Sequence, residues 1–402
     1  MPRTPLALPV LTLLLAACAG ARPPDDVVFF RTSAGIAVVR PGTEPPAVRF
    51  ADAIPSIDGT ALVRASRQGT TTRVVALNAA TGAQLWSRVV PGDMKVAAAS
   101  IGARVVALSS ADQPGPLEGR SRTVLRLVGN GLSSPRKVRV AGNIEPEAFS
   151  TDGHSLFVAQ FHPAEAPTSY QVRRLDLRTE LIGAVYTPDA DLQERMQGTA
   201  RVQAASPDGT RLYTLYSHRT PDGRRYAFVH VLSLDELWAH CVDLPEAFAE
   251  VEDRAAALTV APDGLRLDVA DASSGTVAEI DTQALRVVRT SHVAFGTEGA
   301  PVHAAGGPDG TLYLGSGTSI AAVDRATLQR TRTLDLPGRV TGIQPGADGR
   351  RLYVSLPDRI LVLDPRDGRT LEELSLQRVG AIDRVAPAFF EAEDDEEIIC
   401  AC

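Results

Sequence analysis

Short apolar runs recur along the chain and are separated by polar and turn-forming residues. Residues 202–214, with the sequence VQAASPDGTRLYT, are representative, because two β-rich runs flank an Asp-Gly pair there. Asp-Gly supplies the positive φ that a tight turn needs, so this unit predicts a β-hairpin. The pattern as a whole predicts an all-β chain.

The Asp-Gly turns recur at a regular spacing. They are Asp58-Gly59, Asp152-Gly153, Asp208-Gly209, Asp263-Gly264, Asp309-Gly310 and Asp348-Gly349, with Gly102-Ala103 in place of one copy. From residue 58 to residue 348 the six intervals average about 48 residues, which is the length of a four-stranded propeller blade.

A second mark is an apolar strand that ends in a polar residue before a small turn. Its copies are residues 74–82, 172–176, 277–281, 321–324 and 361–364, with degenerate copies near 128 and 233 and one at 36–40. Counting this mark gives eight units. The first unit lacks an inner strand and residues 379–385 form a spare one, so pairing the two ends would close the ring and remove its open edge. We therefore predict one closed β-propeller of four-stranded blades over residues 27–386, with eight blades favoured over seven.

Two known repeat families resemble these units. The PDG-x-x-LY segments followed by V-x-D are similar to the YVTN repeat, mostly between residues 200 and 370. The segment ALNAATGAQLW, residues 76–86, resembles the quinoprotein (PQQ-like) repeat, which implies that Trp86 docks between neighbouring blades. Both resemblances imply a propeller, a fold that serves many unrelated functions.

The N-terminus carries an export signal. Residues 1–17 contain Arg3 and an apolar stretch of residues 6–17, which is too short to span a bilayer. The following LAAC sequence resembles the lipobox of bacterial lipoproteins, which implies that Cys18 receives a diacylglyceryl group. Residues 18–26 would then link the lipid to the propeller, on the outer face of the cell membrane or at the outer membrane. The alternative is an ordinary secretory signal that leaves Cys18 as a free thiol.

Charge and cysteine content narrow the partners and the chemistry. The formal net charge of −7 argues against nucleic acid as a partner. Four cysteines are too few for a disulfide-built scaffold. The acidic tail of residues 387–402 carries Cys400 and Cys402, which could coordinate a soft metal, pair with each other or with Cys241, or remain thiols.

Long connections cluster in blades three to five and predict a binding rim on one propeller face. They are residues 111–122, 161–170, 187–199, 217–226 and 245–254. Insertions that a compact fold does not need are often functional, with simple toleration as the alternative. The candidate rim residues are Arg195, His218, Arg219, Arg224, Arg225 and Glu250. The arginines could hold an anionic group, or Glu250 could neutralise them.

No motif indicates catalysis. The seven histidines show no metal-binding spacing, and the chain lacks a GxSxG elbow and a Walker loop, so we expect no catalytic residue, metal or cofactor. His240 and Cys241 are strand neighbours that point to opposite faces, which disfavours a Cys-His nucleophile. The sequence therefore favours a lipid-anchored, non-catalytic binding or scaffold module for an envelope protein or a small ligand. The alternatives are a propeller enzyme, quinoprotein dehydrogenase-like or lactonase- or lyase-like, and an outer-membrane assembly lipoprotein.

Overall fold

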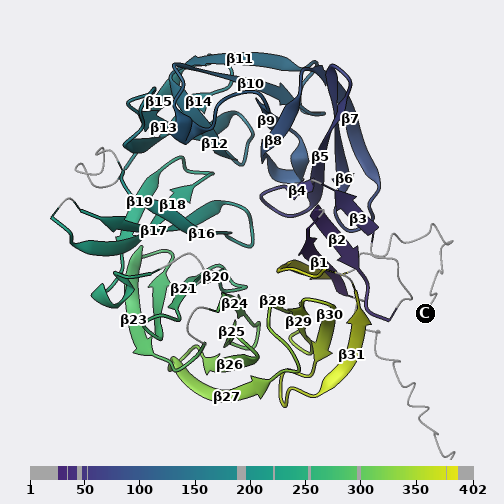
Figure 1. Cartoon of the computed structure of the whole chain (residues 1–402), viewed down its shortest axis with the longest axis vertical. Coiled ribbons are helices and arrows are strands. Elements are labelled where there is room, and N and C mark those ends of the chain that lie inside the picture. Colours follow the sequence, from purple (N-terminus) through teal and green to yellow (C-terminus); the bar gives the residue numbers. More distant parts are fainter. Residues whose placement is uncertain are drawn as a thin grey trace, which may run out of the picture.

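The computed structural model describes residues 26–387 except 34, 43–47, 52, 188–195, 221, 252–254, 297–299 and 377. Within these residues the strands form eight four-stranded antiparallel sheets, which are arranged as the blades of a ring (Figure 1). The predicted all-β propeller is confirmed, and the blade number is eight. The signal segment of residues 1–17 lies outside the described residues, as do Cys18, Arg195, Cys400 and Cys402.

The blades follow one another along the chain, each from its inner to its outer strand. Blade 2 contains β4 (Ala53–Pro55), β5 (Ala61–Gln68), β6 (Thr71–Asn78) and β7 (Gln84–Pro91). Blade 3 contains β8 (Met94–Ala99), β9 (Val106–Ser110), β10 (Arg122–Val128) and β11 (Arg136–Ala141). Blade 4 contains β12 (Asn143–Phe149), β13 (Ser155–His162), β14 (Ser169–Asp176) and β15 (Ile182–Ala184). Blade 5 contains β16 (Thr199–Ala205), β17 (Arg211–Arg219), β18 (Arg225–Ser233) and β19 (Ala239–Asp243).

The second half of the ring repeats this order. Blade 6 contains β20 (Ala256–Val260), β21 (Arg266–Asp271), β22 (Thr276–Asp281) and β23 (Arg286–His292). Blade 7 contains β24 (Val302–Gly306), β25 (Thr311–Ser316), β26 (Ser319–Asp324) and β27 (Gln329–Asp335). Blade 8 contains β28 (Gly342–Pro345), β29 (Leu352–Leu356), β30 (Arg359–Leu363) and β31 (Thr370–Ser375). Short 3-10 turns are η1 (Ile101–Ala103), η2 (Pro116–Glu118) and η4 (Glu246–Phe248).

Blade 1 is assembled from both ends of the chain. Its three outer strands are β1 (Asp26–Thr32), β2 (Gly35–Val39) and β3 (Val48–Ala51), and its inner strand is the C-terminal β32 (Ile382–Pro387). Antiparallel pairing of β1 with β32 joins the purple and yellow ends of the chain in Figure 1. The spare C-terminal strand therefore closes the ring as predicted by supplying the fourth strand of blade 1.

The local sequence marks have clear structural causes. The Asp-Gly turns connect the first strand of a blade to its second, and each turn glycine has a φ between +67° and +80°. The polar residue at the end of the third strand caps the next turn. For example, a carboxylate oxygen of Asp281 accepts hydrogen bonds from the backbone N–H groups of Gln283 and Ala284. Such a side chain satisfies backbone donors that the sheet leaves unpaired.

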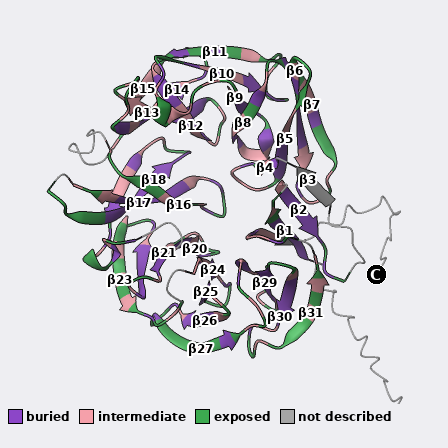
Figure 2. Ribbon diagram, viewed as in Figure 1, coloured by how far each residue is buried: buried purple, intermediate pink, exposed green. Residues whose placement is uncertain are grey.

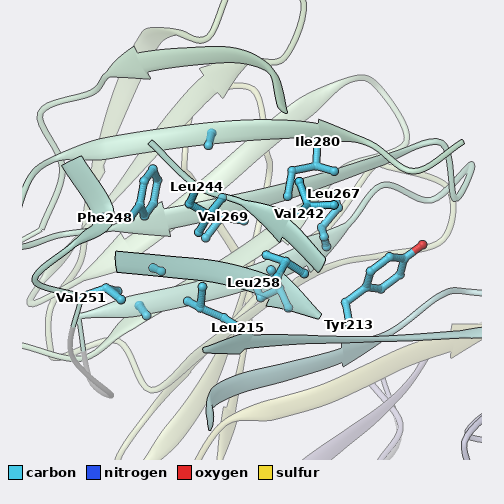
Figure 3. Close-up of a cluster of buried hydrophobic side chains, with 14 of the residues drawn as sticks. Tyr213, Leu215, Val242, Leu244, Phe248, Val251, Leu258, Leu267, Val269 and Ile280 are labelled. Carbon is cyan, nitrogen blue, oxygen red and sulfur yellow. The ribbon is translucent and has the colours of Figure 1, made fainter. Parts of the chain in front are cut away.

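The core lies between the blades. Figure 3 shows one cluster in which Leu215 of β17 packs against Leu258 and Val269 of blade 6, with Phe248 of η4 at its edge. The second and third strands of the blades are mostly buried. In outer strands such as β23, β27 and β31, exposed residues are interspersed with partly buried ones (Figure 2). Trp86 also joins two blades, because its indole Nε1 donates a 2.9 Å hydrogen bond to the carbonyl of Ala103 in blade 3.

A buried ion pair joins blades 6 and 7. The Arg325 guanidinium donates from Nε to Oδ2 of Asp268 at 2.8 Å and from Nη2 to the same oxygen. The Asp268 side chain is fully buried. Because a lone carboxylate there would be unsolvated, this contact fixes one blade against the next.

A cavity of about 770 Å³ runs along the ring axis, lined by inner strands and by Asp-Gly turns.

No helix among the described residues is long and apolar enough to cross a bilayer.

Candidate functional site

The predicted rim lies on one face of the ring. Adjacent strands are antiparallel, so the connections between second and third strands share a face with the links between blades, opposite the Asp-Gly turns. Arg120 joins two of these connections: its backbone N–H donates to the carbonyl of Ala164, and its guanidinium pairs with Glu145 at 2.8 Å. The side chain of Asn143 donates to the carbonyls of Pro116 and Ala164. The insertions of blades 3 and 4 therefore form one packed layer.

The blade 5 insertion is a hairpin extension. The sequence predicted a long loop over residues 217–226, but β17 continues to Arg219 and β18 begins at Arg225. Cross-strand pairing from Arg211 to Arg219 makes these the longest strands of blade 5, and they project beyond the ring in Figure 1. The predicted connection is present between the second and third strands, but its two ends continue the strand pairing, so the turn itself is shorter than the sequence indicated.

Two arginines of the predicted basic cluster form ion pairs with carboxylates. Arg225 forms an ion pair with Glu250, and Arg224 pairs with Asp222 at 3.0 Å. Arg219 lies opposite Arg225 in the strand pairing. The His218 ring meets the ring of Tyr226 edge-on, with centroids 5.0 Å apart. Among the predicted rim residues, His218 lines a cavity between blades 4 and 5.

That cavity has a volume of about 440 Å³ and lies between blades 4 and 5, at the rim face. This volume is within the range of small-molecule sites. Blade 4 and the following link contribute Gln171, Val172, Arg173, Ala184, Val185, Thr187, Met196 and Gln197, and blade 5 contributes His218, Tyr226, Phe228, His230, Ala239, His240, Cys241 and Asp243.

A row of rings forms the wall behind the cavity. Phe161 contacts Tyr170, Tyr170 contacts Tyr216 and Tyr216 stacks on Phe228 at 5.3 Å with an interplanar angle of 15°. The row continues from Phe228 to Tyr226 and from Tyr226 to His218. Within the described part of the chain, all six ring–ring contacts lie at this one blade interface.

Burial perturbs the titratable groups around this interface. It lowers the pKa of His230 to about 4, with a smaller contribution from His240. It raises the pKa of the half-buried Glu147 to about 7, and it raises the pKa of Tyr170 and Tyr216 as well. Perturbed groups gathered at a cavity are typical of functional sites.

Cys241 is the cross-strand neighbour of His230, whereas His240 is its neighbour only along the chain. The strand register places Cys241 opposite His230, and His240 opposite Val231. Burial, and secondarily Asp243, raises the pKa of the Cys241 thiol to about 12. A protonated thiol is a poor nucleophile, so the pair does not have the electrostatics of a catalytic Cys-His site. No group of three or more His, Cys, Asp or Glu side chains in the described ranges is arranged to hold a metal ion.

Sequence reasoning missed most of the cavity. It identified His218 and Cys241 but did not identify Phe228, His230 or the tyrosines of the ring row. A signal was present, because Tyr226, Phe228 and His230 alternate along one strand and must therefore share a face. The partner strand repeats the pattern at Tyr216 and His218.

Comparisons with known proteins bear on the fold. No protein-family model matches the sequence, and no curated protein matches it. AztD from Citrobacter koseri has a similar structure, with a TM-score of 0.53 and 12% identity over 90% of this chain and 97% of that chain. Sqt1 from Saccharomyces cerevisiae has a TM-score of 0.46 and 11% identity, covering 80% of this chain and 83% of its own. The dihydro-heme d1 dehydrogenase NirN has a TM-score of 0.37 and 17% identity, covering 87% and 78%. At these identities the likeness to AztD establishes an eight-bladed propeller fold and nothing finer.

Proposed function

We propose that this protein is a lipid-anchored, non-catalytic binding module of the bacterial cell envelope, which holds a small ligand at the rim of blades 4 and 5. The observation that carries the proposal is the 440 Å³ cavity at that rim, lined by both blades and by the link between them. A cavity of this size with a few convergent polar groups is the usual form of a ligand site.

The start of β1 supports a lipid tether at the face of the Asp-Gly turns, opposite the rim. Asp26 begins β1 at the face of the Asp-Gly turns, where its carboxylate accepts a 2.7 Å hydrogen bond from the Tyr353 hydroxyl. The same carboxylate lies against Gly346, at the first turn of blade 8. Cys18 and Asp26 are eight positions apart in the sequence, a distance of at most about 28 Å when the chain is fully extended. A lipid on Cys18 would therefore hold the turn face toward the membrane and leave the rim facing away from it.

The tether is tested on protein purified from its native membrane. Intact mass should show a diacylglyceryl adduct, and Cys18→Ala should move the protein from the membrane fraction to the soluble fraction. An unmodified Cys18, or a Cys18→Ala protein that stays in the membrane, would contradict the anchor. Absorbance and elemental analysis of the same sample test the enzyme alternative, because a stoichiometric quinone or metal would support it.

The binding role is tested by native mass spectrometry of the protein after incubation with a small-molecule extract of the producing cells. Wild type should retain a compound that Cys241→Trp does not retain, because Cys241 packs against the blade 4 and 5 rings and lines the cavity, which the larger side chain would fill. A matched Ala326→Trp variant outside the cavity serves as the control. Equal retention by all three proteins, or no retained mass, would contradict binding at this cavity. Turnover of the compound would instead favour an enzyme.

A further inference from the structure

A basic seam lies on the outside of the ring between blades 2 and 3. It consists of cationic side chains only, which are Arg88, Arg122, Arg126, Lys137 and Arg139. Strands β7 and β11, which carry Arg88, Lys137 and Arg139, lie at the outer edge of the ring (Figure 1). Among the residues that the structure describes, no carboxylate forms an ion pair with any member of the seam, because the ion pairs found there join other residues.

The strand register places four of these side chains on one face of blade 3. Arg126 lies directly opposite Lys137, and Arg122 and Arg139 are an even number of residues away on the same two strands. Side chains so related share a face of the sheet. Leu108, the partner of Arg126 on β9, packs in the hydrophobic cluster between blades 2 and 3. The four cations therefore lie on the face that blade 3 turns toward blade 2.

Blade 2 contributes Arg88 from the other side of the seam. Arg88 lies opposite Val74 in the pairing of β7 with β6, and Val74 packs in the same cluster between blades 2 and 3. Arg88 therefore points toward blade 3. Trp86, two residues earlier, fixes this strand against blade 3 through its hydrogen bond to the carbonyl of Ala103.

The like charges of the seam repel one another. Arg126 and Lys137 are direct cross-strand neighbours, an arrangement that destabilises a sheet. Arg122, Lys137 and Arg139 are exposed, so a partner from outside the ring can reach them. An extended polyanion bound along these strands would relieve the repulsion and form several charge-assisted contacts at once.

A segment of the complementary charge belongs to this chain. Residues 391–397, with the sequence EAEDDEE, carry six carboxylates and no basic side chain. The last described strand ends at Pro387, which pairs with Asp26 in blade 1, the neighbour of blade 2. The ten positions from Pro387 to Glu397 span at most about 35 Å. A segment tethered this closely has a high effective concentration at a surface within its reach.

We propose that the acidic segment of residues 391–397 docks on the basic seam of blades 2 and 3, with its carboxylates paired to Arg122, Lys137 and Arg139. The seam is separate from the cavity between blades 4 and 5, so this inference goes beyond the proposed function and does not rest on it.

The lysines of the chain provide the test, because Lys95 and Lys137 are the only two. Lys137 belongs to the seam. Lys95 is also exposed but lies on the other face of blade 3, since its partner Ser109 lies opposite Leu125, which packs between blades 3 and 4.

The experiment treats the full-length protein with a carbodiimide, which joins an amine to a carboxylate only where the two are in contact. Peptide mass spectrometry should find Lys137 joined to residues 391–397 at least about five-fold more often than Lys95, since the seam brings several cations to the segment. Salt at about 0.5 M should remove this preference, because it screens exposed charges.

Two sets of variants test the seam without depending on one another. Arg122→Glu/Arg139→Glu should lower the Lys137 cross-link at least about five-fold, whereas Arg178→Glu/Arg286→Glu, which reverses two exposed charges on blades 4 and 6, should cross-link as wild type. Melting temperatures check that each protein is folded. Changing the acidic residues of 391–397 to Asn and Gln should raise the acetylation rate of Lys137 relative to Lys95 at least about three-fold, because an ion-paired amine is protected; this measurement leaves the seam itself intact.

The outcomes identify the occupant. Equal cross-linking of the two lysines, no cross-link from Lys137 to residues 391–397, or unchanged cross-linking in Arg122→Glu/Arg139→Glu overturns docking at the seam. A mixture of isotope-labelled and unlabelled chains should give cross-links within one chain, and cross-links between labelled and unlabelled peptides overturn the proposal in favour of the tail of a second copy. Binding of phosphatidylglycerol vesicles through the seam, without a tail cross-link, overturns it in favour of a lipid surface.

Discussion

His230 makes the stability of this propeller sensitive to pH in a way that one substitution isolates. The side chain is 5% exposed and its ring meets Tyr216 nearly edge-on at 6.3 Å. Burial lowers its pKa from 6.5 to about 4 in the folded protein. The unfolded chain therefore binds a proton that the folded protein does not bind between those two pH values, so the contribution of His230 to stability is complete above pH 6.5 and is lost as the pH falls through 4.

The size of the effect follows from the shift. A difference of about 2.5 pKa units at about 1.4 kcal/mol per unit is worth about 3 kcal/mol. Between pH 7.5 and pH 4.5 most of that amount, about 2–3 kcal/mol, should disappear from the free energy of unfolding. Glu147, whose raised pKa acts with the opposite sign, is present in wild type and variant and cancels in their difference.

The assay compares urea unfolding of wild type and His230→Phe at pH 7.5, 6.0 and 4.5. Phenylalanine keeps a ring against Tyr216 but does not titrate, so wild type should lose about 2–3 kcal/mol more than the variant over this range. His154→Gln, at an exposed position, is the control and should follow wild type. Parallel pH dependence of wild type and His230→Phe would refute the reasoning, since it would mean that His230 titrates in the folded protein as it does in the unfolded chain.

Three further perturbations test how the blades and the rim are held. Arg325→Leu leaves the Asp268 carboxylate buried without its partner and should lower the free energy of unfolding in urea by about 3–5 kcal/mol. The double variant Asp268→Leu/Arg325→Leu should recover most of that loss. An Arg325→Leu variant as stable as wild type would contradict the pairing. Trp86→Phe removes the indole hydrogen bond to the next blade and should cost about 1 kcal/mol, and an unchanged unfolding midpoint would argue against that contact. Gly119→Ala should lower the melting temperature clearly more than Gly223→Ala, because both glycines have positive φ but only at Gly119 would the added carbon clash with a neighbouring backbone, that of Glu165. Equal shifts of the two melting temperatures would contradict the packed rim.

Much of the fold could be predicted from local residues. The Asp-Gly turns with their positive φ and the polar residues that cap the following turn are determined within a few positions of the chain, as at Asp281. Their period predicted the blades, and the spare strand near residue 382 predicted the closure that β1 and β32 make. These features depend on short-range sterics and hydrogen bonding, which the sequence displays directly.

The site was only partly predictable. The long connections of blades 3 to 5 lie on one face of the ring, and His218 and Cys241 line a cavity there. The arginine cluster was a weaker indication of a ligand site, because Arg225 forms an ion pair with Glu250, a residue of the link that follows blade 5. Solvent-exposed charges find partners according to the course of the loops, which the sequence alone does not specify.

The sequence by itself therefore predicted most strands, the Asp-Gly turns and a closed ring with eight blades favoured over seven, because these follow from short-range turn chemistry and from the spacing of the repeats. Only the tertiary structure decided that Tyr170 of blade 4 meets Tyr216 of blade 5, that His230 lies opposite Cys241, and that Asp268 is buried against Arg325. The physical reason is that these contacts depend on how the face of one blade packs on the next, and packing couples residues that are distant in the chain.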